Sequence, residues 1–444
     1  MTDFTNKRVL VAGLGKSGLA AAEFLLARGA RVSIGDEKPL SELANAAAFV
    51  AARGVDYVQL SGATAIEFDL VVQSPGVPPE KPYFENARRA GVKVTGEVEL
   101  AAPFLQGPVI GISGANGKTT VTTLTTKMLE ASGVACQVGG NIGRPVTDMV
   151  QSSRADQWNV LELSSFQLET VETFHAQTAV LLNITANHLD RHKSMDRYVA
   201  AKARLLETQQ AGSTAILNAN DEWCRKLAKR AHGKVQWFSS VAPVDSGYWI
   251  EDGWILRDGA KLLEVGCIGI PGRHNAENVM AAAAAATLAS ANDAAICRTA
   301  NEFQGVEHRI QFVRELRGVR FYNDSKSTTA EAAETAIGAF EGNNLWLILG
   351  GSDKGLDYRH LKPLLQTKAR GVLLIGKIAG QLAEQLEGLP LIQCGTLDAA
   401  VTLAAANAVD GAVVLLSPGT ASYDQYQNYE QRGRAFVELV NSIV

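Results

Sequence analysis

One quarter of the way along the chain, ten residues have the types and spacing needed to hold phosphate groups. Residues 111–120 read GISGANGKTT, after an apolar run at 108–110 and before a Thr-rich helical pattern at 121–132. Glycines let backbone N–H groups turn toward phosphate oxygens, and the N-terminus of the following helix adds a positive dipole. Lys118 supplies a mobile positive charge, and the Thr119 hydroxyl can reach a magnesium ion. The pattern therefore predicts a site for a nucleoside triphosphate.

The glycine spacing of this loop departs from the common Walker pattern. That pattern places a glycine five residues before Gly117, where this chain has Ile112, and the glycines fall at 111 and 114 instead. The stretch is therefore a phosphate loop of a particular kind, and an accidental glycine-rich turn is the alternative.

A carboxylate follows in the sequence LELSSFQL at 161–168. Glu162 falls near the carboxyl end of a strand expected at 159–163, downstream of the phosphate loop. Magnesium prefers oxygen ligands and is needed beside the phosphates, so Glu162 is a candidate ligand. The alternative is a surface glutamate in a strand-to-helix turn.

Two histidines stand four residues apart in the sequence NHLDRH at 187–192. This spacing suits zinc, but no HExxH motif accompanies it and no third Cys or His ligand is evident. His188 follows a strand expected at 179–184, so we favour a position for it near a magnesium ion. His192 is expected to be a solvated residue at a helix end.

The N-terminal segment carries a second phosphate-binding pattern. Residues 13–18 read GLGKSG between a strand expected at 8–12 and a helix expected at 19–27, and Asp36 ends the next strand. Alone, this pattern is typical of an NAD site, but the backbone recognises the diphosphate and not the nicotinamide. The block is short for a complete dinucleotide fold and a second phosphate loop follows, so a UDP-type ligand fits better.

Three loops in the last third of the chain share small and polar residues able to fix anionic oxygens. They are 323–328 (NDSKST), 350–355 (GGSDKG) and 417–424 (SPGTASYD). Each follows or adjoins a predicted strand, so they are expected to form one crevice at the carboxyl ends of a parallel sheet.

The elements that must position these residues fall into three blocks with strand–helix alternation. We predict an α/β fold with three domains: a Rossmann-like UDP-binding domain at 1–96, a central P-loop ATPase-like domain at 97–305, and a Rossmann-like domain at 306–444. A helix is expected at 195–209, strands at 345–349, 371–375 and 412–416, and a β-rich insertion at 233–270.

Composition limits the class of protein. The 444 residues are 46% hydrophobic and 20% charged with a net charge of −4, which gives no sign of a nucleic-acid partner. The five cysteines form no C-x-x-C pair, and the N-terminus lacks the apolar region of a signal peptide. The longest apolar run, at 279–289, is too short to cross a membrane. A monomer in the cytoplasm, without a membrane partner, is expected.

Taken together, the motifs resemble those of a known family. The phosphate loop, ELSSFQL, NHLDRH, the lysine in AAKARL, GRHNAEN, HRI, NDSKST, GGSDKG and SPGTASYDQY occur in the order found in the ATP-dependent Mur ligases of bacterial peptidoglycan synthesis. The resemblance covers essentially the whole chain. GGSDKG, and SPGTASYDQY with Tyr429, are most similar to the members that add D-glutamate to UDP-N-acetylmuramoyl-L-alanine.

The resemblance implies a role for each matched residue. Gly13, Leu14, Gly15, Lys16, Ser17, Gly18, Asp36, Glu37 and Ser74 would bind the UDP substrate. Gly114, Ala115, Asn116, Gly117, Lys118, Thr119, Thr120, Asn141, Asn278, Arg309 and Asp324 would bind ATP. Thr328, Lys354, Ser422 and Tyr429 would hold D-glutamate, so that the domain at 306–444 would bind the amino acid. Thr119, Glu162, His188 and a carbamylated Lys202 would hold Mg²⁺, and Lys118, His188 and Lys202 would be the catalytic residues.

Taken by itself, Lys202 would pass for an ordinary solvated lysine of a helix, so its role depends on the resemblance. The chain also departs from the family at Gly419 and Thr420, where Ala-Cys is common, and at Glu37, next to Asp36. An NAD-dependent oxidoreductase with an extra domain, another Mur ligase, folylpolyglutamate synthase and a nucleotide-binding regulatory protein are the alternatives.

Overall fold

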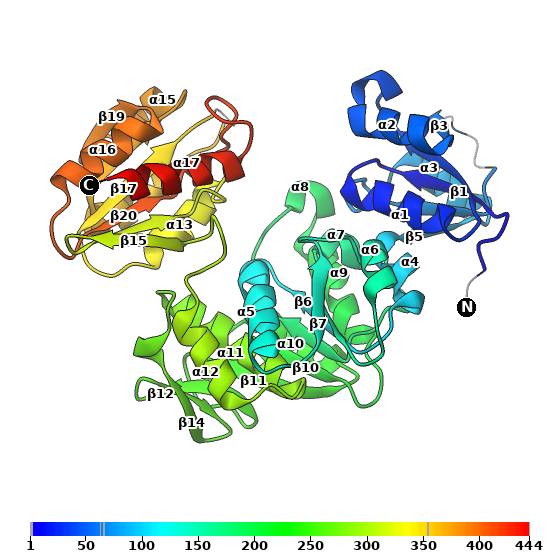
Figure 1. Ribbon diagram of the computed structural model, residues 1–444, viewed down its shortest axis with the longest axis horizontal. Helices are drawn as coiled ribbons and strands as arrows, with labels where there is room; N and C mark the ends of the chain where they lie inside the picture. Colours follow the sequence, from blue (N-terminus) through cyan, green and yellow to red (C-terminus); the bar gives the residue numbers. More distant parts are fainter. Residues whose placement is uncertain (1–2, 63, 65–66, 353–354, 444) are drawn as a thin grey trace. The chain divides into compact units, whose positions relative to one another are not determined.

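The computed structural model describes residues 3–62, 64, 67–352 and 355–443 (Figure 1). The chain divides into two compact units, one of Met1–Val265 with Glu277–Thr299 and one of Gly266–Ala276 with Ala300–Val444. The first unit contains two sheets and the second contains one. Among the described residues, no helix combines the length and apolar character needed to cross a membrane.

The N-terminal domain is a parallel sheet of five strands in the order β3-β2-β1-β4-β5. The strands are β1 (Arg8–Ala12), β2 (Arg31–Asp36), β3 (Asp56–Gln59), β4 (Leu70–Gln73) and β5 (Lys93–Gly96), and the helices are α1 (Lys16–Leu26), α2 (Ala44–Arg53) and α3 (Pro82–Arg89). Alternate residues of β1 face opposite sides, so Val9 and Val11 pack in the core beneath α1, whereas Leu10 packs with Tyr83 and Phe84 of α3. The strand order reverses between β1 and β4, which places a ligand crevice at their carboxyl ends.

The central domain is built on a sheet of nine strands in the order β14-β13-β12-β11-β10-β9-β6-β8-β7. Its strands are β6 (Val109–Ser113), β7 (Cys136–Gly140), β8 (Trp158–Glu162), β9 (Thr178–Leu181), β10 (Thr214–Asn218), β11 (Lys234–Ser239), β12 (Gly247–Glu251), β13 (Trp254–Arg257) and β14 (Ala260–Glu264). Its helices are α4 (Glu97–Ala101), α5 (Lys118–Ala131), α6 (Val146–Met149), α7 (Ser165–Leu168), α8 (Leu189–His192), α9 (Met195–Glu207), α10 (Glu222–Leu227), α11 (Arg273–Leu288) and α12 (Asp293–Glu302).

The segment at 233–270 is β-rich as expected, but it is not an insertion. β11 pairs in parallel with β10, β12 pairs in parallel with β11, and β13 and β14 add antiparallel strands at the edge. The interpretation as an insertion was wrong because short alternating runs indicate strands without indicating the sheet that they join.

The C-terminal unit contains a six-stranded sheet in the order β15-β16-β20-β17-β18-β19. Its strands are β15 (Gln311–Leu316), β16 (Val319–Asn323), β17 (Leu345–Gly350), β18 (Ala369–Ile375), β19 (Leu391–Gly395) and β20 (Val413–Leu416). Its helices are α13 (Ala330–Gly338), α14 (Lys362–Lys368), α15 (Ala379–Gln385), α16 (Leu397–Asn407) and α17 (Tyr429–Ser442). Separate apolar cores lie on the two faces of the sheet, one with α13 and α14 and the other with α16 and α17. The α/β fold class with parallel, Rossmann-like sheets is thereby confirmed, whereas the domain limits at 96 and 305 stay predictions.

Candidate functional site

The phosphate loop joins the central strand β6 to the N-terminus of α5. Gly117 caps the helix with φ of 85°, a conformation that favours glycine, and a Cβ there would lie 2.4 Å from Asn278 Oδ1. The N–H groups of Ala115 and Asn116 donate to Asn183 O and Asn183 Oδ1, both at 2.9 Å. The loop is therefore held by the end of β9, with Asn278 beside it.

Lys118 and Lys202 meet at one carbonyl of this loop. Lys118 Nζ donates to Gly114 O at 2.9 Å and to Ala115 O at 3.0 Å, and Lys202 Nζ donates to Gly114 O at 2.8 Å. Thr119 and Thr120 follow on α5 and are buried. The structure thus brings both candidate catalytic lysines to the phosphate loop.

Lys202 is a buried side chain, only 1% exposed. Its Nζ also lies 3.3 Å from Ser113 Oγ and 5.0 Å from the centre of the Tyr198 ring, and no carboxylate pairs with it among the described residues. Burial, together with the positive charge of Lys118, lowers the pKa of the Lys202 amine well below its ordinary value. The sequence held a signal for this burial, because Lys202 shares the apolar face of α9 with Tyr198, Leu205 and Leu206.

Glu162 ends β8 with one carboxylate oxygen satisfied and the other not. Its Oε1 accepts a hydrogen bond from Asn141 Nδ2 at 2.7 Å, whereas its buried Oε2 has no partner among the described residues. Asn141 itself follows β7, and its N–H donates to Glu162 O. A buried carboxylate oxygen without a partner is costly unless a cation or donor compensates it, so Glu162 suits a magnesium ion.

His188 precedes α8 in a left-handed conformation, with φ of 55°. Its ring lies 5.0 Å from the Phe166 ring, between centroids. Among the residues that the structure describes, no three His, Cys, Asp or Glu side chains form a group able to bind a metal ion.

The expectation that His192 is solvated was wrong. Its side chain is 1% exposed and makes hydrogen-bond contacts with Ser165 Oγ at 2.9 Å and Glu169 Oε1 at 3.1 Å. Burial, followed by the positive charge of Arg191, lowers the pKa of His192 to about 4, so the imidazole is neutral at pH 7. The error arose because α8 is a single turn, and its exposure depends on the tertiary contacts of α7 and not on local pattern.

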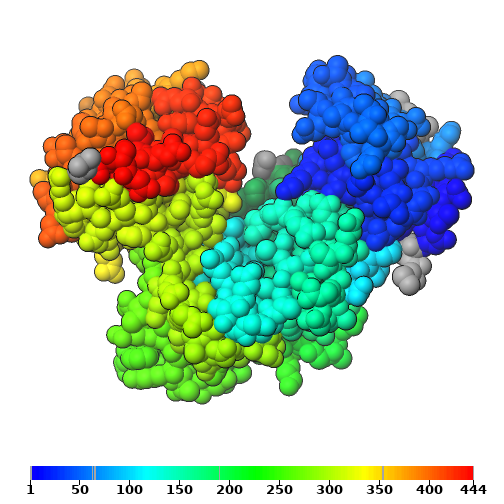
Figure 2. Space-filling model, viewed as in Figure 1, coloured from blue at the N-terminus to red at the C-terminus, as the bar shows by residue number. Residues whose placement is uncertain are grey.

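A pocket of about 420 Å³ lies at the glycine turn of the N-terminal domain. Residues from both domains of the first unit, blue and cyan to green in Figure 2, line it. The lining includes Gly13, Leu14, Gly15, Lys16, Ser17, Asp36, the loop 74–77, Gly140, Asn141, Gly143, Pro145 and Gln167. Asn141, which the resemblance assigns to ATP, thus lines this pocket as well.

Two of the residues expected at this pocket do not line it. Gly18 is a packing residue, because a Cβ there would lie 1.9 Å from Gly13 O. Glu37 points to Lys81, with which it forms an ion pair at 2.6 Å. Ser74 does line the pocket, and its Oγ donates to Gly13 O at 2.6 Å.

The three polar loops of the C-terminal unit come together at the carboxyl ends of β16, β20 and β17. Thr420 Oγ1 donates to Ser352 O at 2.6 Å, and Ser417 Oγ donates to Asp324 Oδ2 at 2.8 Å. Burial raises the pKa of Asp324 to about 7. The adjacency of these strands therefore brings the three polar loops together within the unit, as predicted.

The remaining predicted residues of this unit are buried or half-buried, except for one that lies outside the described chain. Ser422 is buried, Thr328 and Arg309 are half-buried, and the ring of Tyr429 at the start of α17 lies 6.1 Å from that of His308. Lys354 lies outside the described residues. Sequence reasoning missed Arg432, a buried cation that donates to Ser325 Oγ at 3.0 Å and to Thr420 O at 3.1 Å.

Comparisons with known proteins cover nearly the whole chain. Three family models match: the Mur ligase MurD-like N-terminal domain at residues 7–96, the Mur ligase middle domain at 112–286, and the Mur ligase glutamate ligase domain at 308–419. The chain is 53% identical to a UDP-N-acetylmuramoylalanine–D-glutamate ligase of Solibacter usitatus, over 98% of each chain. It is 46% identical to a protein of the same name from Acidobacterium capsulatum, over 99% of this chain and 97% of the relative.

Solved structures with low identity share the fold. A UDP-N-acetylmuramate-alanine ligase of Thermotoga maritima aligns with a TM-score of 0.60 at 17% identity, covering 98% of this chain and 100% of that one. A pseudomurein peptide ligase type C of Methanothermus fervidus aligns with a TM-score of 0.58 at 17% identity, covering 99% and 100%.

Proposed function

This chain belongs to the Mur ligase family, and on that premise we propose that it joins D-glutamate to UDP-N-acetylmuramoyl-L-alanine, using ATP, in the synthesis of peptidoglycan precursors. The observation that carries this proposal is the 53% identity, over 98% of each chain, with a relative named for that reaction. The phosphate loop and the separate pocket at the N-terminal glycine turn support it, because the reaction needs two nucleotide sites.

The chemistry explains why ATP is required. A carboxylate is a poor electrophile, so the alanyl carboxylate first attacks the γ-phosphorus of ATP, which forms an acyl phosphate and releases ADP. The amine of D-glutamate then attacks the acyl carbon, loses a proton, and expels inorganic phosphate as the amide bond forms. Phosphoryl transfer of this kind depends mainly on positioning and charge neutralisation. A nucleophilic side chain is therefore not required.

Lys118 is proposed to neutralise the transferring phosphoryl group. Its Nζ contacts Gly114 O and Ala115 O, so it lies on the loop whose N–H groups would cradle the phosphates. His188 is proposed to lie beside the metal ion, and it could also accept the proton of the attacking amine.

Lys202 is proposed to be carbamylated. The ammonium first gives one proton to water, which burial favours because it lowers the pKa of the amine. The nitrogen lone pair of the neutral amine then attacks carbon dioxide to form a carbamate, with loss of a second proton to water. The charge changes from +1 to −1, and the side chain then offers oxygen atoms to a magnesium ion.

The unpartnered Glu162 Oε2 fits a magnesium ion, which Thr119, His188 and the carbamate of Lys202 would help to hold. Bound there, the ion would neutralise phosphate charge during transfer.

The nucleotide-binding residues would be Gly114 to Thr120, with Asn141, Asn278, Arg309 and Asp324. Thr328, Lys354, Ser422 and Tyr429 are proposed to bind D-glutamate, and Gly13 to Ser17 with Asp36 and Ser74 the UDP substrate. We also propose that the protein acts as a monomer in the cytoplasm.

Phosphate release measured with each substrate omitted in turn tests this function. We expect release only when ATP, UDP-N-acetylmuramoyl-L-alanine and D-glutamate are all present. With ¹⁸O in the alanyl carboxylate, one labelled oxygen should appear in the released phosphate, because the acyl phosphate transfers it. Phosphate without label would contradict the acyl-phosphate route, and no dependence on the UDP substrate would contradict the function.

The Lys202→Ala variant tests the carbamate. It should be badly impaired, and short carboxylic acids added to the medium should partly restore phosphate release by occupying the vacated space. Lys202→Arg keeps the positive charge and should not be rescued, whereas Lys229→Ala, an exposed lysine, should keep wild-type activity. Wild-type rates for Lys202→Ala would remove the residue from the site.

A further inference from the structure

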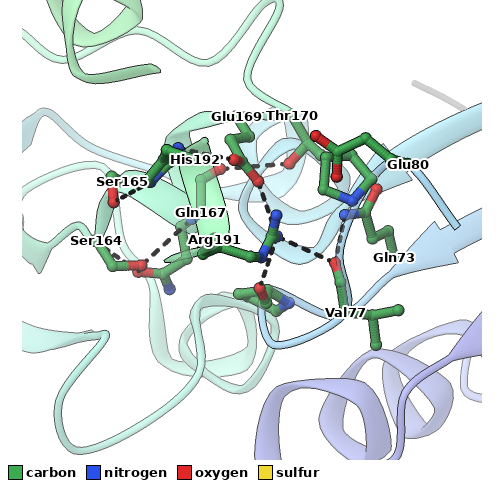
Figure 3. A network of polar contacts seen from close by, with 12 residues as sticks. Gln73, Val77, Glu80, Ser164, Ser165, Gln167, Glu169, Thr170, Arg191 and His192 are labelled. Atoms are coloured by element: carbon green, nitrogen blue, oxygen red, sulfur yellow. Dashed lines mark hydrogen bonds and ion pairs between the residues drawn. The ribbon is translucent and has the colours of Figure 1, made fainter. Parts of the chain in front are cut away.

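A buried polar cluster connects the N-terminal domain to the central domain (Figure 3). It consists of Arg191, Glu169, His192 and Ser165, together with the loop 74–77, and we name it the Arg191 cluster. The roles assigned above to the phosphate loop, the metal ligands and the UDP pocket make no use of its charged members.

Arg191 is the centre of this cluster. Its Nη2 donates to Glu169 Oε2 at 2.9 Å and to Val77 O at 3.1 Å, and it lies 3.4 Å from Pro75 O. The side chain is only 10% exposed, and its guanidinium lies 4.9 Å from the centre of the Phe166 ring. Because the loop carbonyls and the carboxylate belong to different domains, one guanidinium nitrogen ties the two domains together.

Glu169 is itself fixed by the central domain. Its Oε1 lies 3.1 Å from His192 Nδ1, and His192 Nε2 lies 2.9 Å from Ser165 Oγ. A neutral imidazole has one donor and one acceptor, so Nδ1–H donates to the carboxylate and Nε2 accepts from the serine hydroxyl. The carboxylate that holds Arg191 is therefore itself anchored, through His192, to Ser165 of the central domain.

The Arg191 cluster lies between two parts of the proposed reaction site. On one side, the loop 74–77 lines the 420 Å³ pocket that is proposed for the UDP substrate. On the other side, Phe166 contacts both His188 and His192, with ring centroids 5.0 and 5.3 Å apart. If Arg191 moved, both the pocket-lining loop 74–77 and the turn that carries His188 would therefore be expected to shift.

We propose that Arg191, held by Glu169, is a positioning residue that fixes the loop 74–77 against the turn carrying His188. By holding this loop, it would keep the carboxylate of the bound UDP substrate correctly placed relative to the ATP site at the phosphate loop. The inference rests on the proposed function and adds a residue to it. Misplacing a substrate by about 1 Å can cost on the order of 10²-fold in rate, so such a residue should affect both substrate binding and turnover.

The same interface provides a matched control. Arg197 of α9 and Glu80 also pair across it, at 3.4 Å, but their side chains are 63% and 48% exposed. Exposed ion pairs contribute little because water screens them. If any cation that pairs across this interface could position the loop 74–77, replacing Arg197 would change kcat and KM as much as replacing Arg191.

Steady-state kinetics of Arg191→Met, Arg191→Lys, Glu169→Gln and Arg197→Met test the inference. For Arg191→Met we expect a KM for UDP-N-acetylmuramoyl-L-alanine raised at least about tenfold and a kcat lowered by a similar factor or more, whereas the KM for D-glutamate changes less than about twofold. Arg191→Lys should recover part of both losses, and Arg197→Met should match the wild type. Glu169→Gln should reproduce the Arg191→Met pattern, and the double variant should be no worse than Arg191→Met alone.

Unchanged kcat and KM with only a lower melting temperature would overturn the inference and leave the Arg191 cluster a stabilising contact. If Arg191→Met does not fold, Arg191→Lys and Glu169→Gln decide, and wild-type kinetics for both would likewise overturn it. A wild-type enzyme that does not use the UDP substrate would instead refute the proposed function, so the two failures are distinguishable.

Discussion

At the scale of single residues, the phosphate loop places two lysine amines on one carbonyl, that of Gly114. Lys118→Ala would remove the charge that is proposed to neutralise the transferring phosphoryl group. We expect a loss in rate on the order of 10²-fold or more, measured as phosphate release at saturating substrates. Lys127→Ala, which changes an exposed lysine of the same helix, is the matched control and should have little effect. Near-wild-type activity of a folded Lys118→Ala variant would be incompatible with the role given to this loop.

Glu97 allows a test of how burial changes the pKa of a carboxyl group and, through it, the stability of the fold. It is fully buried and accepts hydrogen bonds from the N–H and hydroxyl of Thr147, at 2.6 and 2.9 Å, but burial outweighs these and raises its pKa to about 7. The unfolded chain ionises this acid near 4.5, so the proton stabilises the folded state below that pH. As pH rises from about 4.5 to 7, this contribution of roughly 3 kcal/mol is lost.

The Glu97→Gln variant removes the titration and keeps an oxygen acceptor. Its thermal midpoint relative to wild type should therefore rise between pH 5 and pH 8, whereas that of Glu130→Gln, an exposed acid, should not. A midpoint difference that stays constant across this range would show that Glu97 does not titrate in the folded protein there.

Sequence predicts residues whose role is local and misses those whose role is tertiary. Gly117 and Lys118 were identifiable because backbone conformation and spacing define a phosphate loop within ten residues. For Lys202, the pattern of α9 indicates burial but not the phosphate-loop carbonyl that its amine reaches, and the burial of His192 results from its contact with Ser165 of α7. Arg432 was missed for the same reason, since its partners at 325 and 420 are distant in sequence.

At the scale of elements, the glycine turn after β1 decides which nucleotide the N-terminal domain accepts. We expect it to bind UDP-N-acetylmuramoyl-L-alanine and to have no measurable affinity for NADH. Gly18→Ala should abolish the binding of the UDP substrate, because the new Cβ would lie 1.9 Å from Gly13 O and 2.6 Å from Ser74 Oγ. Gly62→Ala in the same domain meets only ordinary contacts at 3.7 Å and should bind normally.

Equilibrium binding followed by calorimetry for the UDP substrate, and by fluorescence for NADH, provides the measurement. Tight binding of NADH to the wild type would favour an oxidoreductase over a ligase. Unimpaired binding of the UDP substrate by Gly18→Ala would show that the close approach of this glycine to Gly13 has no part in shaping the pocket.

Strands with strong apolar runs were predictable from the sequence, but the neighbouring strands with which they pair were not. β1 and β17 read as continuous apolar runs because both faces of a parallel sheet are covered, and both strands lie where the sequence places them. The run at 233–270 gave the right kind of structure but the wrong role, since pairing of β11 with β10 is a long-range choice.

At the scale of the whole molecule, three sheets with their own cores supply three kinds of loop at strand ends. We propose that the glycine turn, the phosphate loop and the polar loops of the C-terminal unit bind the UDP substrate, ATP and the anionic amino acid, respectively. The order of these motifs along the chain was readable from the sequence, and the strand–helix alternation around them predicted the α/β class that the structure confirms.

The choice of amino acid tests the central claim most directly. Phosphate release and formation of the UDP-linked product should be measured with ATP, UDP-N-acetylmuramoyl-L-alanine and one amino acid at a time: D-glutamate, L-glutamate, L-alanine or meso-diaminopimelate. We predict rapid turnover with D-glutamate and little with the other three, because the polar loops of the C-terminal unit are expected to fix both carboxylates of one enantiomer. Equal turnover with L-alanine or diaminopimelate would contradict the assignment as a D-glutamate-adding ligase.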